Sequence, residues 1–361
     1  MKRIVLSMFF ALVSYSVWSQ LEIINTETPE QLVLNTFMGD NLSISNIKFN
    51  GSTASAQNWR DQIGRYSNGT ASLNSEEGLI LATGNVSVAL GPNNSGSKSD
   101  LTLIPVIGDA DLAMISGATV NTVCKLEFDF IPNGDTVLFE YIFASEEYPE
   151  YVNTPFNDTF GLFLSGPGIS GPYIDGAINI AVIPGTSQSV SINNLNNGNA
   201  NLGPCENCQY YISNGVGTTP DINSEMQYDA RSSIFTASGA VNPGETYHLK
   251  FVIGNIGTDN AYDSAMFLTQ GSLRSAILHT QNFERGKIRI FPNPATDFIQ
   301  ISEADNISQV KVYDLQGRTV INIKAQSADL KIDTSRLQVG TYIVEFVSTN
   351  DEIARERLVI K

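Results

Sequence analysis

The sequence has few of the residues on which redox, metal and acyl-transfer chemistry usually depend. Its 361 residues include three cysteines and two histidines. His248 lies in a strand-like segment, Tyr247–Gly254, and His279 follows in a segment between two folded regions. Neither histidine lies near a nucleophile motif such as Gly-x-Ser-x-Gly. We therefore interpret both as structural, and we expect no catalytic triad.

Basic residues and long apolar runs are also scarce. The chain has 21 Lys and Arg against 37 Asp and Glu, a net charge of −16. A nucleic-acid partner needs a basic surface, so we exclude it. Beyond the N-terminus no run approaches the roughly 20 apolar residues of a membrane helix, so we expect no transmembrane segment in the mature chain. The chain is still long enough, with 42% hydrophobic residues, to bury a sizeable core in about two domains.

The first 19 residues have the order of a secretory signal peptide. Two basic residues open the chain, an apolar run follows at Ile4–Val13, and Val17 and Ser19 fit the small-residue positions of a cleavage site. Cleavage after Ser19 leaves Gln20 as the first residue of the mature chain. The sequence therefore predicts a secreted protein.

From Gln20 to Leu273 the pattern predicts an all-β fold. Two short helices are expected, one from Thr28 to Gly39 with a Thr28/Gln31 capping box and one from Asp109 to Gly117. The other periodic segments are short, β-rich and separated by Gly, Asn and Pro. They lie at residues 42–49, 63–66, 78–84, 122–130, 137–144, 159–164, 178–185, 246–255 and 263–273. This arrangement indicates a jelly-roll-like β-sandwich with short capping helices.

The stretch Val137–Gly168 contains the candidate site. Val137–Ala144 and Thr159–Leu164 are apolar and aromatic, and we expect them to pair as a hairpin in one sheet. The loop between them carries four carboxylates: Glu146, Glu147, Glu150 and Asp158. A hairpin gathers these acids at one end of the sheet.

Calcium binding is one interpretation of this acidic loop, because Ca²⁺ takes six to eight oxygen ligands from carboxylates, carbonyls and waters. Asp158 and Asp263 each begin a strand after an acidic loop, and a sandwich can bring such strand ends together. The predicted calcium ligands are Glu146, Glu147, Asp158 and Asp263. Glu150 is interpreted as a solvated acid. The alternatives are that all are solvated loop acids, or that two form a glycosidase pair flanking a cleft, although the sequence selects no such pair.

The motif Cys205-Glu-Asn-Cys208 admits three interpretations. A redox pair needs a strand-to-helix context, and zinc needs two further Cys or His ligands; the neighbouring sequence has neither. In an exported protein a local disulfide between Cys205 and Cys208 is favoured. Pairing of Cys124 with one of these two cysteines is the alternative.

Several segments together resemble the choice-of-anchor L domain of secreted bacterial proteins. The resemblance covers roughly Gln20–Leu273, and the segments that carry it are residues 68–85, 139–168, 182–196 and 250–273. It implies an extracellular β-rich module, named for the varied C-terminal sorting signals that accompany it. It implies no catalytic residue.

The tail from Ile288 to Lys361 alternates apolar and polar residues and predicts a small Ig-like antiparallel β-sandwich of about seven strands. Pro292 and Pro294 suit an edge or entry position. The tail resembles the C-terminal type A sorting domain of the type IX secretion system of Bacteroidetes. This implies the type IX machinery as partner and a location at the cell surface, attached to the outer membrane after sorting. The alternative is an ordinary Ig-like accessory domain. Arg274–Lys287 is interpreted as the linker.

These observations favour a binding protein over an enzyme. We expect a secreted, surface-displayed module that acts in adhesion or in glycan or matrix binding, with calcium as its one expected cofactor. The alternatives are a secreted polysaccharide hydrolase and a passive structural component of the surface or matrix. This expectation depends on location and fold analogy, since no motif selects a ligand.

Overall fold

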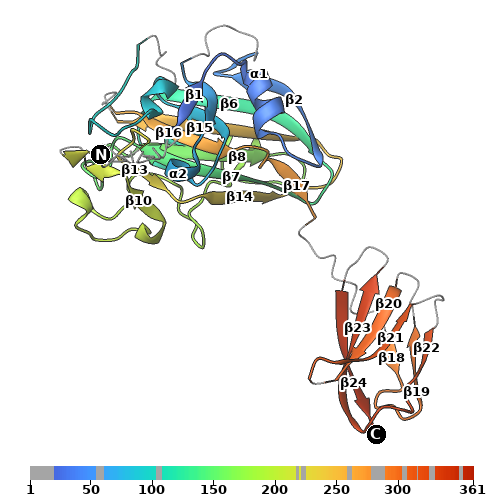
Figure 1. Ribbon diagram of the computed structural model, residues 1–361. Coiled ribbons are helices and arrows are strands. Elements are labelled where there is room, and N and C mark those ends of the chain that lie inside the picture. The colour runs from blue at the N-terminus through green and yellow to red at the C-terminus, as the bar shows by residue number, and fades with distance from the viewer. Residues whose placement is uncertain are drawn as a thin grey trace, which may run out of the picture. The chain divides into compact units, whose positions relative to one another are not determined.

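A computed structural model describes residues 20–53, 61–102, 108–216, 219–220, 225–257, 262–277, 289–302, 307–314, 316–324, 330–348 and 353–361. The chain divides into two compact units, residues 1–276 and 277–361, and each is described by itself (Figure 1). The signal peptide expected at residues 1–19 and His279 lie outside the described residues.

The first unit is a sandwich of two large antiparallel sheets (Figure 1). The nine-stranded sheet contains β1 (Glu22–Ile24), β4 (Ile63–Ser67), β5 (Gly78–Ala82), β16 (Ser264–Thr269), β7 (Thr136–Ser145), β13 (Ala230–Ser232), β10 (Tyr211–Ser213), β14 (Phe235–Ala240) and β17 (Arg274–Ala276). The six-stranded sheet contains β3 (Ser52–Thr53), β2 (Leu42–Phe49), β6 (Val120–Pro132), β15 (Tyr247–Ile256), β8 (Thr159–Ser165) and β9 (Ile178–Asn179). A two-stranded ribbon joins β11 (Gly215–Val216) to β12 (Thr219–Pro220). The predicted all-β sandwich is confirmed.

The helices are short. They are α1 (Pro29–Leu32), the π-helix η1 (Val33–Phe37), α2 (Thr70–Leu73), α3 (Ala110–Ser116), and the 3₁₀ turns η2 (Val86–Ala89), η3 (Ile174–Gly176), η4 (Asn199–Asn201) and η5 (Cys208–Tyr210). The Thr28/Gln31 capping box is present. Asp109 caps α3, which ends at Gly117 with a positive φ of 65°. Both helices expected from the sequence therefore start where their capping residues place them.

β7 is the central strand of the nine-stranded sheet. It pairs with β13 and β14 on one side and with β16 and β17 on the other. β8 pairs with β15 and β9 in the opposite sheet. The prediction that Val137–Ala144 and Thr159–Leu164 form a hairpin is therefore wrong, because the acidic loop crosses from one sheet to the other. An apolar run buried on both faces shows no alternation that would specify its partner.

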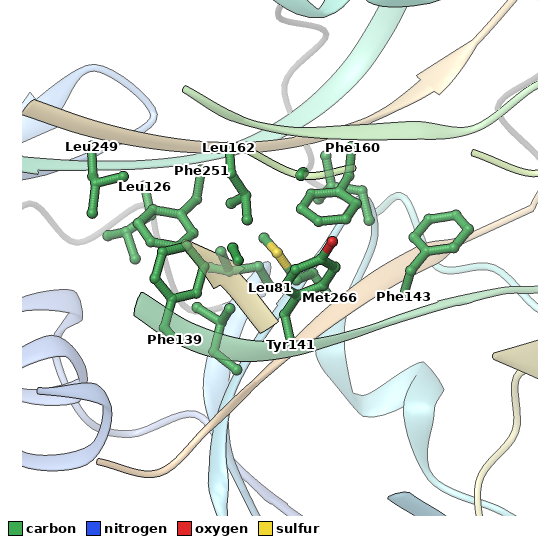
Figure 2. Packing of buried hydrophobic residues seen from close by; sticks show 14 of the residues in the cluster. Leu81, Leu126, Phe139, Tyr141, Phe143, Phe160, Leu162, Leu249, Phe251 and Met266 are labelled. Atoms are coloured by element: carbon green, nitrogen blue, oxygen red, sulfur yellow. The ribbon is translucent and has the colours of Figure 1, made fainter. Parts of the chain in front are cut away.

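Aromatic side chains fill the space between the two sheets. Phe139, Tyr141 and Phe143 of β7 point toward the six-stranded sheet, where Phe160 and Phe251 meet them (Figure 2). The Tyr141 and Phe160 rings lie edge to face with centroids 5.0 Å apart, and those of Phe139 and Phe251 are 5.2 Å apart. Such pairs add about 0.5–1.5 kcal/mol each to the free energy gained from buried area.

The other face of β7 is buried as well. Ile142 and Ala144 pack with Ala265 and Phe267 of β16 in a second apolar cluster on the outer side of the nine-stranded sheet. Tyr228 belongs to the same cluster. Since successive residues of a strand point to opposite faces, the residue that follows Ser145 is directed toward this second cluster. That residue is Glu146.

The second unit contains seven strands among its described residues. One sheet is formed by β18 (Arg289–Phe291), β19 (Phe298–Ser302) and β22 (Leu330–Asp333). The other is formed by β21 (Thr319–Lys324), β20 (Ile307–Tyr313), β23 (Gly340–Ser348) and β24 (Ile353–Ile360). Both sheets contribute to one apolar core. Pro292 and Pro294 follow the edge strand β18, where no ladder donor is needed.

The first unit extends past the start of the expected linker. Arg274–Ala276 form β17 and pair with β7, so the segment interpreted as a linker from Arg274 to Lys287 begins inside the sandwich. Among the described residues, no helix is both long enough and apolar enough to cross a membrane.

His248 lies on the outer face of the six-stranded sheet between two carboxylates. Its Nδ1 is 2.8 Å from Asp129 Oδ1, and its Nε2 is 3.7 Å from Glu127 Oε1. Glu127 and Asp129 raise the pKa of His248, and partial burial opposes them. His248 therefore has structural partners, in agreement with its interpretation from the sequence.

A raised pKa makes this contribution to stability depend on pH. Protonated His248 stabilises the fold fully below the unfolded-state pKa of about 6.5, and the contribution is lost as the pH rises through the higher folded-state pKa. We expect His248→Gln to lower the free energy of unfolding by up to about 1 kcal/mol at pH 5.5, the range of part-exposed ion pairs, and to have little effect at pH 9. Urea unfolding at both pH values checks this. An equal loss at both would show that the effect is packing.

Candidate functional site

The four residues predicted as calcium ligands are all buried. Glu146 and Asp263 are 0% exposed, Asp158 is 1% and Glu147 is 4% exposed. Glu150 is exposed, as expected for a solvated acid. Burial distinguishes the four from solvated loop acids, because an ionised carboxylate removed from water costs several kcal/mol unless it is paired.

The structure places the four on two sides of the nine-stranded sheet. Glu146 and Asp263 lie next to each other at the adjoining ends of β7 and β16. Ser145 pairs with Ser264, so Glu146 and Asp263 are the next opposite pair, and the Glu146 amide donates a hydrogen bond to the Asp263 carbonyl at 3.0 Å. Side chains opposite each other in antiparallel strands have Cβ atoms about 4.5–5.5 Å apart. Both carboxylates therefore lie together on the outer face.

Glu147 and Asp158 lie at the inner face, where the loop enters β8. The Asp158 amide donates to Glu147 Oε2 at 3.1 Å. Asp158 Oδ1 accepts from the Ile256 amide at 3.0 Å, and Oδ2 accepts from the Ser264 hydroxyl at 2.6 Å. Since Ile256 and Ser264 belong to opposite sheets, the Asp158 carboxylate joins the two sheets and both of its oxygens have protein donors.

Asp229 is an acidic neighbour that the sequence analysis missed. Ala230 pairs with Ser145, so Asp229 precedes β13 directly beside Glu146, and it is 0% exposed. We call Asp229, Glu146 and Asp263 the acidic row. The signal in the sequence is weak, because Asp229 stands before a strand of three residues whose pattern is too short to recognise.

Polar groups from another segment cover the acidic row. The Lys98 amide donates to Glu146 Oε2 at 3.4 Å and the Asp100 amide to Asp263 Oδ2 at 2.9 Å. The buried Asn93 donates from Nδ2 to Asp229 Oδ1 at 2.7 Å. Each carboxylate of the row therefore has one oxygen bound by a protein N–H.

A glycine makes room for the Asp263 side chain. A Cβ atom on Gly84 would overlap the Asp263 carboxylate, because it would lie much closer to Oδ2 than nonbonded atoms approach. Gly84 is also the position opposite Asp263 if the pairing of Ala82 with Ala265 is continued. The end of β5 is therefore shaped around this carboxylate.

Burial makes the acidic row weakly acidic. Burial, followed by the negative charge of Asp229, raises the pKa of Glu146 to about 9. Burial also raises the pKa of Asp229 and of Asp263 to about 7, against the hydrogen bonds from Asn93 and from the Asp100 amide. Burial, then the charges of Asp263 and Glu146, raise the pKa of the Tyr228 hydroxyl. Ionising the row without a counter-charge is therefore unfavourable.

Within the described residues, no three side chains of the His, Cys, Asp or Glu type are placed so that they could hold one metal ion. The predicted set of four ligands is not assembled at one point, since Glu146 and Asp263 are together and Glu147 and Asp158 are together elsewhere. A cation at either pair needs additional oxygens from amides, main-chain carbonyls or water.

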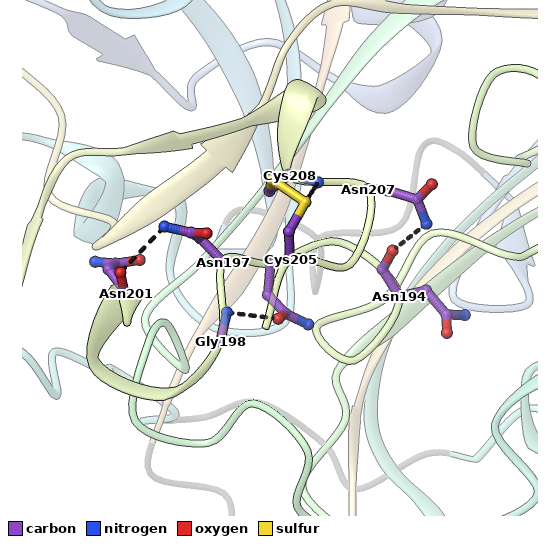
Figure 3. Close-up of a disulfide and its surroundings, with 8 residues drawn as sticks. Asn194, Asn197, Gly198, Asn201, Cys205, Asn207 and Cys208 are labelled. Carbon is purple, nitrogen blue, oxygen red and sulfur yellow. Dashed lines mark hydrogen bonds between the residues drawn. A yellow bond between two sulfur atoms is a disulfide. The ribbon is translucent and has the colours of Figure 1, made fainter. Parts of the chain in front are cut away.

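The Cys205-Glu-Asn-Cys208 motif forms a local disulfide. The Cα atoms of Cys205 and Cys208 are 5.2 Å apart, and Cys124 is a buried free thiol, so the alternative pairing is not formed. Asparagine side chains tie the surrounding loop together, with Asn207 donating to the Asn194 carbonyl and Asn197 to the Asn201 carbonyl (Figure 3). The loop is thus braced by covalent and hydrogen bonds.

Comparisons with known proteins identify both units. The family model of the Choice-of-anchor L domain matches residues 20–274, and that of the Secretion system C-terminal sorting domain matches residues 289–361. Beta-agarase D of Zobellia galactanivorans is 35% identical over 74 residues, which are 20% of this chain and 15% of the agarase. That stretch is too short a part of the agarase to transfer its activity.

Two solved structures from Porphyromonas gingivalis show weak similarity. PorZ, described as an essential bacterial surface component of the type-IX secretion system, is 19% identical over 29% of this chain and 14% of its own, with a TM-score of 0.20. Dimeric latent PorU is 10% identical over 90% of this chain and 29% of its own, with a TM-score of 0.17. Scores this low carry no argument about fold or function.

The two family matches agree with the segments from which the sequence resemblances were drawn. The first covers most of the chain, and the second covers the remaining C-terminal unit. The chain therefore belongs to the choice-of-anchor L domain family, and its C-terminal sorting domain marks it as a type IX secreted protein of the cell surface.

Proposed function

We propose that the module, residues 20–274, is an adhesion domain that binds glycan or matrix polymer at the cell surface without cleaving it. The observation that carries the proposal is the fusion of this module to a sorting domain that delivers it to the surface. A protein held at that location meets polymers of the matrix and of neighbouring cells. Binding requires only an accessible surface, whereas hydrolysis also requires placed acid and base groups.

The placement of the carboxylates supports binding over hydrolysis. Glu146, Asp158 and Asp263 are buried and bonded to main-chain amides or to a serine hydroxyl. A glycosidase acid and its partner instead flank a cleft that admits a sugar. Two hollows lined by described residues of the module measure about 260 and 240 Å³, and these acids line neither.

The disulfide-braced loop, residues 193–210, is the surface we propose for contact. Leu202 in this loop is 88% exposed, and Asn197, Asn199 and Asn201 precede it in the sequence. A loop already held by a disulfide and hydrogen bonds loses little conformational entropy when it binds. An exposed leucine in a braced, asparagine-rich loop offers both apolar and polar contacts to a polymer.

A glycan array with the secreted chain, run beside a hydrolysis screen on the same sugars, tests the proposal. We expect binding without release of product. Leu202→Ser should weaken binding at least severalfold with an unchanged melting temperature, and Ile131→Ser, at an exposed apolar position on β6, should have no effect. Sugar turnover would establish the hydrolase, and silence in both assays would leave a structural component of the matrix.

The sorting domain generates a separate prediction about export. A chain truncated before Ile288 should cross the inner membrane through its signal peptide and remain in the periplasm. The reason is that the sorting domain, which the type IX machinery recognises, is missing. Cell fractionation and surface labelling of the full and truncated chains measure this. As the converse, Ile288–Lys361 fused to an inert secreted protein should bring it to the surface. Surface display of the truncated chain would contradict the assignment.

A further inference from the structure

The acidic row contains buried oxygens that have no partner among the described residues. They are Glu146 Oε1, Asp229 Oδ2 and Asp263 Oδ1. The hydroxyl of Tyr228, which is fully buried and close enough to Glu146 and Asp263 for their charges to act on it, also has no partner there. Buried polar atoms are nearly always hydrogen-bonded, so each exception needs an explanation.

A second buried acidic group in the same module shows what satisfied carboxylates look like. Asp109 caps the N-terminus of α3 and Asp111 lies in its first turn. The Lys250 ammonium is 3.0 Å from both Asp109 oxygens and 2.6 Å from Asp111 Oδ2. Among the residues that the structure describes, no Lys, Arg or His forms an ion pair with a carboxylate of the acidic row. The buried Arg231 donates to the Ser232 carbonyl instead. The row therefore lacks the cation that the other group has.

We propose that the acidic row binds a calcium ion, with Glu146 and Asp263 as its carboxylate ligands. The two side chains are opposite each other across β7 and β16, and each has one oxygen held by an N–H of the Lys98–Asp100 segment and one oxygen left over. Asp229 adds negative charge beside them. Main-chain carbonyls, amide oxygens and water supply the other ligands, as is usual for calcium.

The donor set selects calcium among common metals. The acidic row offers oxygen atoms only, and oxygen donors suit hard cations, whereas zinc and copper favour Cys and His. Mg²⁺ demands a small octahedral site and keeps its waters, while Ca²⁺ accepts irregular sets of six to eight oxygens. A secreted module also needs only a weak site, since extracellular calcium modules bind with dissociation constants of about 10⁻⁴–10⁻³ M.

Thermal unfolding of the full secreted chain in a chelator and in calcium chloride tests the site. We expect the melting temperature of the module to rise by about 5–10 °C at a hundredfold excess of calcium over its dissociation constant. Titration calorimetry with calcium alone should give one ion per chain. Magnesium should produce a smaller rise. Identical melting curves in calcium and chelator, or an equal effect of magnesium, would overturn the proposal.

Three variants locate the site. Glu146→Gln and Asp263→Asn keep the side-chain shape but remove charge, so each should lose most of the calcium-induced rise while melting in chelator at or above the wild-type temperature. The melting temperature in chelator thus shows that these two variants are folded. The matched control is Asp158→Asn, on the opposite face of the sheet, which should keep the rise. A rise that survives in the first two variants, or disappears in the control, would contradict the acidic row as the site.

Discussion

Burial of β7 on both faces is the constraint on which the rest of the module depends. One face supplies Phe139, Tyr141 and Phe143 to the core between the sheets, and the other supplies Ile142 and Ala144 to the outer cluster. A strand in this position needs partners along both edges and cover on both sides. Four strands provide the edges. The charged residues that directly follow the strand, Glu146 and Glu147, are therefore buried as well.

Local structure could be predicted from the sequence, and pairing between distant strands could not. The capping box at Thr28 and the helix that begins after Asp109 depend on residues a few positions apart, and both are present. The closeness of β7 and β8 in the sequence predicts a hairpin, but the two strands lie in different sheets. Because each run is apolar without a strict period, nothing in it distinguishes a neighbour in the same sheet from one in the facing sheet.

The candidate site was partly predictable for the same reason. Alternation continued past the end of β7 directs Glu146 and Glu147 to opposite faces, and the prediction that both belong to one set of calcium ligands did not allow for it. Asp263 joins Glu146 because β16 pairs with β7. Asp229 arrives through β13, whose three residues carry no readable period. Residues that meet through long-range pairing are found only when the sheet order is known.

The charge imbalance of the chain gives the acidic row its significance. The chain has 37 acidic and 21 basic residues, so 16 carboxylates are left over if each Lys and Arg pairs with one. On the surface water solvates such groups, but inside the module they must be stabilised by hydrogen-bond donors, a proton, a buried lysine or a metal ion. Lys250 does this for Asp109 and Asp111. The calcium ion proposed for the acidic row would supply the missing positive charge from the surroundings of the exported protein, and it would couple the stability of the module to the medium outside the cell.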